Sequence, residues 1–173
     1  MNRLWIALLA CGFFSVVAMA AVQAPPEGKR TRVGVYDSRA IAIAYAPSRF
    51  NPVREKTKEL EQAKAAGDSR KVKELEAWGE KHQRALHRQG FGRVPVGDLL
   101  DPVRDRLPGV AREARVDVIC AECDFSAADV ELVDVTRALA LLYEPSEKTL
   151  GYIDEIKQHA PVDLDEIDRG HDH

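Results

Sequence analysis

Two cysteines separated by two residues, Cys120 and Cys123, have the spacing in this chain that most directly suggests chemistry. A Cys-x-x-Cys pair forms a disulfide, or a redox-active dithiol where a helix N-terminus lowers the pKa of the first thiol. Here the pair follows an apolar run and enters a turn, and the neighbouring carboxylates of Glu122 and Asp124 are expected to raise thiol pKa values. The pattern favours a structural disulfide, with free buried thiols and a thiol oxidoreductase as alternatives.

A metal site is not indicated by these cysteines. Zinc would need two further ligands, and the chain holds no second Cys-x-x-Cys pair. The terminal His171 and His173 are typical of a solvated end. His82 and His87 are five residues apart, which is not the spacing that places two imidazoles on one helical face, so they are interpreted as polar surface. We therefore expect no metal and no cofactor.

The other residue types that could support catalysis do not form a constellation. Asp37 and Ser38 follow a predicted strand, where functional groups of α/β folds often lie, but capping of the next helix explains both. No carboxylate pair lies in an apolar setting, and no glycine-rich phosphate loop is present. The sequence predicts a non-catalytic protein, and the thiol chemistry of Cys120 and Cys123 remains the enzymatic alternative.

The N-terminus has the pattern of a secretory signal peptide over residues 1–20. Arg3 precedes an apolar run, and Ala18-Met19-Ala20 forms an Ala-x-Ala cleavage site. Cleavage after Ala24, lipidation at Cys11 and retention as a membrane anchor are the alternatives. Residues 21–31 are expected to form a flexible leader. The protein is predicted to be periplasmic or secreted, which favours a bonded or redox-active state for a lone cysteine pair.

A charged stretch over residues 52–89 predicts a helical arm. Asn51-Pro52 resembles a helix start, and Gly90 is expected to end the arm with a positive φ. Gly67 followed by Asp68 favours a hairpin of two helices over one long helix. The apolar stripe is thin, so the arm buries little surface of its own and is expected to contact another molecule.

Four residues of this arm and its end are the candidate partner-binding residues, because aromatic and Arg side chains are enriched at interfaces. They are Trp78, Arg84, Arg88 and Phe91. Trp78 has a second interpretation, as a filler of the seam between the two helices.

Charge is distributed unevenly along the chain. Residues 53–88 carry ten basic and seven acidic residues, whereas residues 124–173 carry four basic and thirteen acidic ones. A basic arm on an acidic body steers charged partners. Nucleic acid is not expected, because acidic residues are interleaved along the arm and the protein is predicted to be exported. Proteins, a second copy of the chain and anionic envelope surfaces are the expected partners.

The remaining chain predicts a small body. Strands are expected at residues 32–37, 116–120 and 130–135, the last two joined by a hairpin-sized connection. Helices are expected at 39–45, 95–114, 136–143 and 147–159, and Pro108 is expected to kink or split the second of them. The fold class is α+β: a sheet of about three strands, several helices and a projecting charged arm. One domain over residues 32–160 is followed by an acidic tail, 161–173, predicted to be disordered.

The order of these motifs resembles a known family. An exported strand Val33-Gly34-Val35-Tyr36-Asp37-Ser38, a charged helical arm, then Val116-Asp117-Val118-Ile119 and Val133-Asp134-Val135-Thr136 before a helix is similar to the Skp/OmpH-like periplasmic chaperones. The Lys-Val-Lys-Glu-Leu-Glu arm and its Gly90-Phe91-Gly92 end also resemble a group of uncharacterised exported bacterial proteins.

The resemblance to the chaperones implies a trimer whose coiled arms hold unfolded outer-membrane proteins. This chain departs from that pattern in its short arm, its extra helix at 95–114 and its cysteine pair. The expected function is a holdase or adaptor that oligomerises through its body and contacts clients with its arm. A thiol-disulfide redox protein is the alternative.

Overall fold

The structure is a computed structural model that describes residues 30–170. The predicted signal peptide, most of the predicted leader and the last three residues lie outside this range. Within the described residues, no helix combines the length and apolarity needed to cross a membrane.

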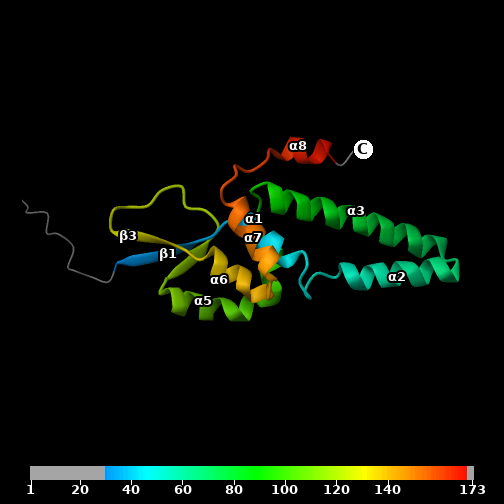
Figure 1. Cartoon of the computed structure of the whole chain (residues 1–173), viewed down its shortest axis with the longest axis horizontal. Helices are drawn as coiled ribbons and strands as arrows, with labels where there is room; N and C mark the ends of the chain where they lie inside the picture. Colours follow the sequence, from blue (N-terminus) through cyan, green and yellow to red (C-terminus); the bar gives the residue numbers. More distant parts are fainter. Residues whose placement is uncertain (1–29, 171–173) are drawn as a thin grey trace, which may run out of the picture.

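The fold is α+β, as predicted: a three-stranded sheet and several helices form a body, from which a helical hairpin projects (Figure 1). The elements in order are β1 (Thr31–Val35), α1 (Ser38–Tyr45), α2 (Val53–Ala66), α3 (Ser69–Phe91), α4 (Gly97–Leu100), the 3-10 helix η1 (Asp101–Arg106), α5 (Leu107–Ala114), β2 (Val118–Cys120), β3 (Val130–Asp134), α6 (Thr136–Ala140), the 3-10 helix η2 (Leu141–Tyr143), α7 (Glu147–Ile156) and α8 (Leu164–Arg169).

The sheet is parallel throughout, and β1 is its central strand. Val33 pairs with Val118 of β2 on one side and with Leu132 of β3 on the other. The predicted hairpin between the last two strands is therefore wrong. The nine residues between β2 and β3 reach about 30 Å when extended, enough to return the chain to the start of a parallel strand.

Only one face of this sheet is covered by the helical core. Gly34 is buried there, and a Cβ at this position would lie 3.2 Å from side-chain atoms of both Val116 and Val135, so glycine fits where a larger residue would crowd them. On the opposite face, Val118 and Leu132 are 52% and 43% exposed. An apolar sheet face thus remains open to solvent.

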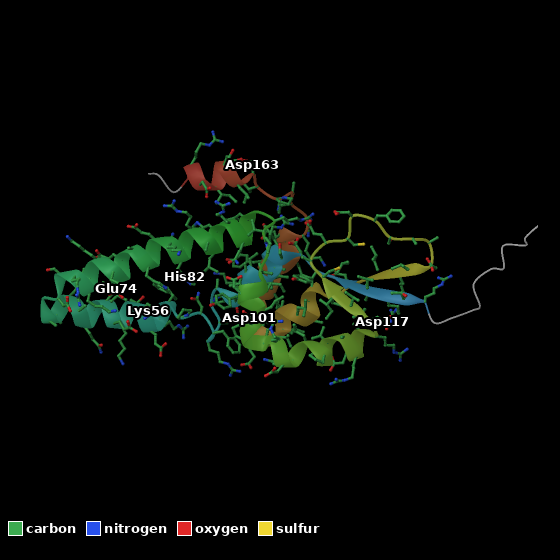
Figure 2. The ribbon with its side chains drawn as sticks, turned by 180° about the vertical axis from the view of Figure 1, so that it is seen from behind. Lys56, Glu74, His82, Asp101, Asp117 and Asp163 are labelled. Atoms are coloured by element: carbon green, nitrogen blue, oxygen red, sulfur yellow. The ribbon has the colours of Figure 1, made fainter. Side chains whose placement is uncertain are left out.

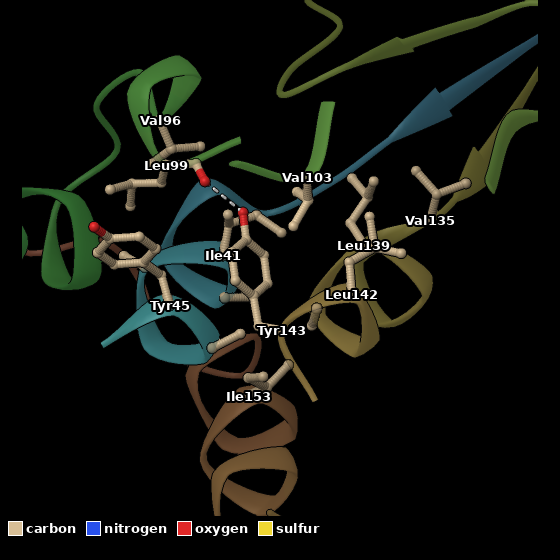
Figure 3. Packing of buried hydrophobic residues seen from close by; sticks show 14 of the residues in the cluster. Ile41, Tyr45, Val96, Leu99, Val103, Val135, Leu139, Leu142, Tyr143 and Ile153 are labelled. Atoms are coloured by element: carbon tan, nitrogen blue, oxygen red, sulfur yellow. Dashed lines mark hydrogen bonds between the residues drawn. The ribbon is translucent and has the colours of Figure 1, made fainter. Parts of the chain in front are cut away.

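The core is built around α1, which is buried on nearly every side. Ile41 is fully buried among side chains of α4, α6 and α7 (Figure 3). Tyr143 packs edge-on against Tyr45, and its hydroxyl donates to the Leu99 carbonyl at 2.7 Å. A helix of eight residues is marginal on its own, so α1 depends on burial against its neighbours for its stability.

A buried ion pair fixes the start of α1. Of the two residues expected to cap the helix, Asp37 is the cap: it accepts from the Arg39 backbone N–H at 3.0 Å, and Ser38 is the first helical residue. The Arg39 guanidinium is 1% exposed, binds both oxygens of Asp37 and donates to the His159 carbonyl. Burial by itself raises the pKa of Asp37, but the hydrogen bonds and charge of Arg39 outweigh it, and the net pKa is lowered.

The arm, which we define as α2 and α3, is a hairpin, as the sequence favoured. Gly67 ends α2 with a φ of +70°, which glycine adopts at little cost, and Asp68 caps α3 by accepting from the Lys71 N–H. The expected end of the arm is wrong: Gly90 is helical, and α3 continues through Phe91 to a cap at Gly92.

Two further expectations are corrected. The helix predicted over 95–114 is three short segments, α4, η1 and α5; the break between η1 and α5 agrees with the expected split at Pro108, which lies in the first turn of α5, whereas the break between α4 and η1 was not expected. Residues 164–169, predicted to be disordered, form α8, which lies along α3 (Figure 1). Ile167 of α8 is buried, and Leu164 and Ile167 both contact the end of α3, so tertiary contacts order a segment whose composition suggested disorder.

Candidate protein-binding site

The arm meets the body along the second half of α3, residues 79–91, which we call the arm base. It packs against α1 on one side and against α8 on the other. Small residues allow the close approach: a Cβ at Gly90 would lie 3.9 Å from that of Ala42. Two hollows flank this part of α3, one toward each neighbour.

The first hollow, the α1–α3 pocket, has a volume of about 440 Å³ and is mostly apolar. Its lining consists of Ala42, Ile43, Ala46, Asn51, Val53, Gly79, His82, Gln83, Leu86, His87, Gly90 and Phe91. A Cβ at Gly79 would meet nothing within 4 Å, so this glycine is not required by packing. It leaves the pocket open where a side chain would narrow it.

His82 forms a polar contact at the rim of this pocket. Its Nε2 lies 2.9 Å from Oδ1 of the buried Asn51, whose amide donates to the Ala46 carbonyl, and its ring stacks on Trp78. Figure 2 shows His82 at the root of the arm, closer to the body than Glu74. Burial lowers the pKa of His82, and the charge of Asp98 partly opposes this. His82 therefore links the arm to the segment that enters it, which corrects its interpretation as polar surface.

The second hollow, the α3–α8 groove, has a volume of about 690 Å³. Its lining consists of Glu80, Gln83, Arg84, His87, Phe91, Val162, Glu166, Ile167 and Gly170. Arg88 of α3 forms an ion pair with Asp168 at 2.8 Å, and the Val162 N–H donates to the Phe91 carbonyl at 3.0 Å. Acidic α8 is thereby held against the basic arm base.

The structure brings three of the four predicted partner-binding residues together. Phe91 is 47% exposed and lines both hollows, Arg84 lines the groove, and Arg88 binds α8. Trp78 lies apart from them, half-buried in a shallow hollow between α2 and α3 beside Leu60 and Leu75. Its position fits the seam interpretation.

Sequence reasoning missed the α1 side of the pocket and Gly79. The residues from α1, such as Ala42 and Ile43, lie far from the arm in sequence, and only the tertiary packing places them beside it. Gly79 carried a signal: a glycine inside a 23-residue helix lowers helix propensity and often has a packing or functional reason.

A third hollow of about 470 Å³ lies at the carboxyl ends of the parallel strands, where α/β folds commonly bind ligands. Most of its charged side chains are already paired: Asp37 with Arg39, Asp134 with Lys157, and Glu122 with Arg93, while Asp124 is exposed. No group of three or more His, Cys, Asp or Glu in the described part of the chain is arranged to hold a metal ion. This crevice offers less for a ligand than the arm base.

The cysteine pair lies beside that crevice as two free thiols. Burial raises the pKa of Cys120, and the proximity of Cys123 adds to the increase. The raised direction was expected, but its causes are burial and the second thiol rather than Glu122 and Asp124. Cys123 approaches the Phe125 carbonyl at 3.1 Å. A raised pKa keeps the Cys120 sulfur protonated at neutral pH, the opposite of what a redox catalyst needs.

The arm base is thus the surface with an apolar hollow, an exposed aromatic ring and arginines in one place. A scan against protein-family models, a search of curated proteins and a search of solved structures each found no match to this chain.

Proposed function

We propose that this chain is an exported, non-catalytic holdase or adaptor that binds client proteins at the base of its helical arm. The observation that carries the proposal is the apolar α1–α3 pocket with the half-exposed Phe91 at its rim. The signal-peptide pattern of residues 1–20 supports export.

The size and lining of the pocket suit an apolar side chain of a client. Its volume of about 440 Å³ lies within the range of ligand pockets, roughly 300–1,000 Å³. Burying one large apolar side chain contributes about 1.5–3 kcal/mol, so a single contact is weak and several along the arm are needed. Weak contacts of this kind suit a protein that holds and then releases its clients.

The open face of the sheet supports self-association through the body. Parallel sheets are usually covered on both faces, yet Val118 and Leu132 are exposed on this face, and Phe125 of the β2–β3 connection is 84% exposed. We propose that a second copy of the chain covers this face. Light scattering coupled to gel filtration should give an oligomer for the chain from residue 21 onward, and Leu132→Asp should reduce its mass to that of a monomer.

Suppression of aggregation tests the client-binding role. An outer-membrane β-barrel protein, unfolded in urea, is diluted into buffer with an equimolar amount of this chain, and turbidity is recorded. Gly79→Leu places a side chain where the pocket is open and should weaken suppression. Gly79→Ala is the matched control and should retain it. If the unmodified chain leaves turbidity unchanged, the holdase role is excluded.

The thiol-disulfide alternative is addressed by alkylation of Cys120 and Cys123 as a function of pH after mild reduction. The raised pKa of Cys120 supports the non-catalytic proposal, because alkylation of this thiol should require alkaline pH. Rapid alkylation at neutral pH would instead favour a redox protein.

A further inference from the structure

The helix α8 has the composition of a ligand for the arm base. The segment from Asp163 to Arg169 alternates acidic residues with two apolar ones, Leu164 and Ile167, three residues apart on one helical face. A Cβ at Gly92 would lie 2.6 Å from Leu164 Cδ2 and 3.4 Å from Ile167 Cδ1, so both side chains contact the end of α3. Figure 2 shows Asp163 at the start of this helix, beside the arm.

The attachment of α8 to the arm is weak. The helix has six residues, too few to be stable on its own, so it depends on the arm for its conformation. Its ion pair with Arg88 is between a third and two-fifths exposed on both sides, which limits its strength. In addition, the Oδ1 atom of Asp168 is buried without a hydrogen-bond partner among the described residues. Because burying an oxygen without a hydrogen-bond partner costs free energy, another segment can replace this contact.

The α3–α8 groove shows that α8 leaves part of this surface uncovered. Arg84 and Phe91 line the groove, and neither is buried. A longer acidic amphipathic helix would place carboxylates near Arg84 and Arg88 and apolar side chains on Gly92 and Phe91. Such a helix would make the contacts that α8 makes and would also contact the uncovered Arg84 and Phe91.

We propose that α8 is an intramolecular ligand of the arm base, and that the partner segment this surface takes is an acidic amphipathic helix that replaces α8. The inference rests on the proposed function for the role of the arm base, and it names the chemistry of the client segment. The apparent affinity for such a segment is reduced by the fraction of molecules in which α8 occupies the surface.

The probe is a fluorescent peptide with the sequence of residues 161–170, titrated with the chain from residue 21 onward at low salt and followed by anisotropy. Ile167→Ser removes the buried contact of α8 and should strengthen peptide binding by about tenfold relative to the unmodified chain. Asp168→Lys replaces the ion pair with Arg88 by repulsion between two cations. This variant should also strengthen peptide binding, and it leaves the apolar contact of α8 unchanged. Hydrogen exchange of the α8 amides verifies that the helix is released in both variants.

Arg88→Glu added to Ile167→Ser should remove the gain, and raising the salt concentration should weaken binding of the peptide. The inference is overturned if the released variants bind the peptide no more tightly than the unmodified chain. Equal binding would mean that the peptide occupies a surface that α8 does not cover.

The two proposals can fail separately. Loss of aggregation suppression in Gly79→Leu tests the pocket, whereas peptide binding to Ile167→Ser tests the α8 surface. A chain that binds the peptide but never suppresses aggregation lacks the holdase role and keeps the α8 surface. A chain that suppresses aggregation but gains no peptide affinity on release of α8 has the holdase role alone.

Discussion

The body and the arm are held together by different means. In the body, α1 alone buries seven residues, among them Arg39, which forms an ion pair with the capping Asp37. In the arm, α2 buries only Ala63, and α3 buries Leu75 along the seam and Gln89 and Gly90 where it joins the body. The outer part of the arm is thus fixed by two buried side chains and by its caps.

This difference divides the work between the two regions. The body has enough buried apolar surface to fold as a unit, and its stability should be sensitive to single substitutions. The arm buries little apolar surface along its seam, so substitutions there should change the stability of the whole protein only slightly. The arm base, however, is flanked by the two hollows. We therefore expect stability to depend on the body and partner binding to depend on the arm base.

The largest expected effect separates two helix caps of the same type. Asp37→Ala leaves the buried Arg39 guanidinium without its partner and should lower the free energy of unfolding by about 3–5 kcal/mol. Asp68→Ala, in the arm, removes only a cap and should cost about 1 kcal/mol. Urea denaturation followed by circular dichroism measures both. Equal losses would contradict the division between body and arm.

A similar contrast is expected for two buried leucines. Leu139 is fully buried in the core, and Leu139→Ala should destabilise the protein by about 3 kcal/mol through the lost contacts and the cavity. Leu75 is 4% exposed in the seam, and Leu75→Ala should open the arm locally and leave the main unfolding transition little changed. Hydrogen exchange of α2 and α3 amides should speed up in Leu75→Ala, while that of α1 stays unchanged.

The stability of the body should depend on acid pH through Asp37. Because the folded-state pKa of Asp37 is lowered, its ionised form stabilises the native state above its ordinary pKa of about 3.9, and this stabilisation is lost as the pH falls through the folded value. The difference in unfolding free energy between the unmodified chain and Asp37→Asn should shrink over that range. A difference that stays constant down to strong acid would show that the charge of Asp37 is not responsible.

Replacing two glycines by alanine should change the stability of the protein in opposite directions. Gly79→Ala removes an unfavourable helical glycine where a Cβ has free space, so the arm should gain about 0.5–1 kcal/mol. Gly34→Ala, in the body, brings a Cβ to 3.2 Å from Val116 and Val135 and should be destabilising. Thermal unfolding of the two variants measures the pair. A loss of stability in Gly79→Ala would mean that this glycine is needed for packing.

The smallest effect is expected at the surface of the arm. Lys64 and Glu76 form an ion pair across the hairpin at 3.0 Å, with both side chains about half exposed. Exposed pairs typically contribute about 0–1 kcal/mol. Lys64→Ala should therefore change the free energy of opening the arm by less than Leu75→Ala does. A double-mutant cycle with Glu76→Ala isolates the pair. A coupling well above that range would show that surface charge, rather than the seam, holds the arm.

Several elements could be predicted from local sequence signals. Gly67 and Asp68 mark the turn of the hairpin because a positive φ and a capping carboxylate are requirements of single residues. The α+β class followed from periodicity. The strand pairing did not, because a nine-residue connection is compatible both with a hairpin and with a return to a parallel strand.

The sequence by itself determined the charged helical arm and the three short strands, favoured a hairpin over one long helix, and indicated Arg84, Arg88 and Phe91 as candidate contacts, since these depend on residue types and short spacings. The tertiary structure alone decided that Ala42 and Ile43 complete a pocket with α3, and that α8 is ordered on the arm. Both depend on contacts between residues far apart in the chain, which local propensity does not encode.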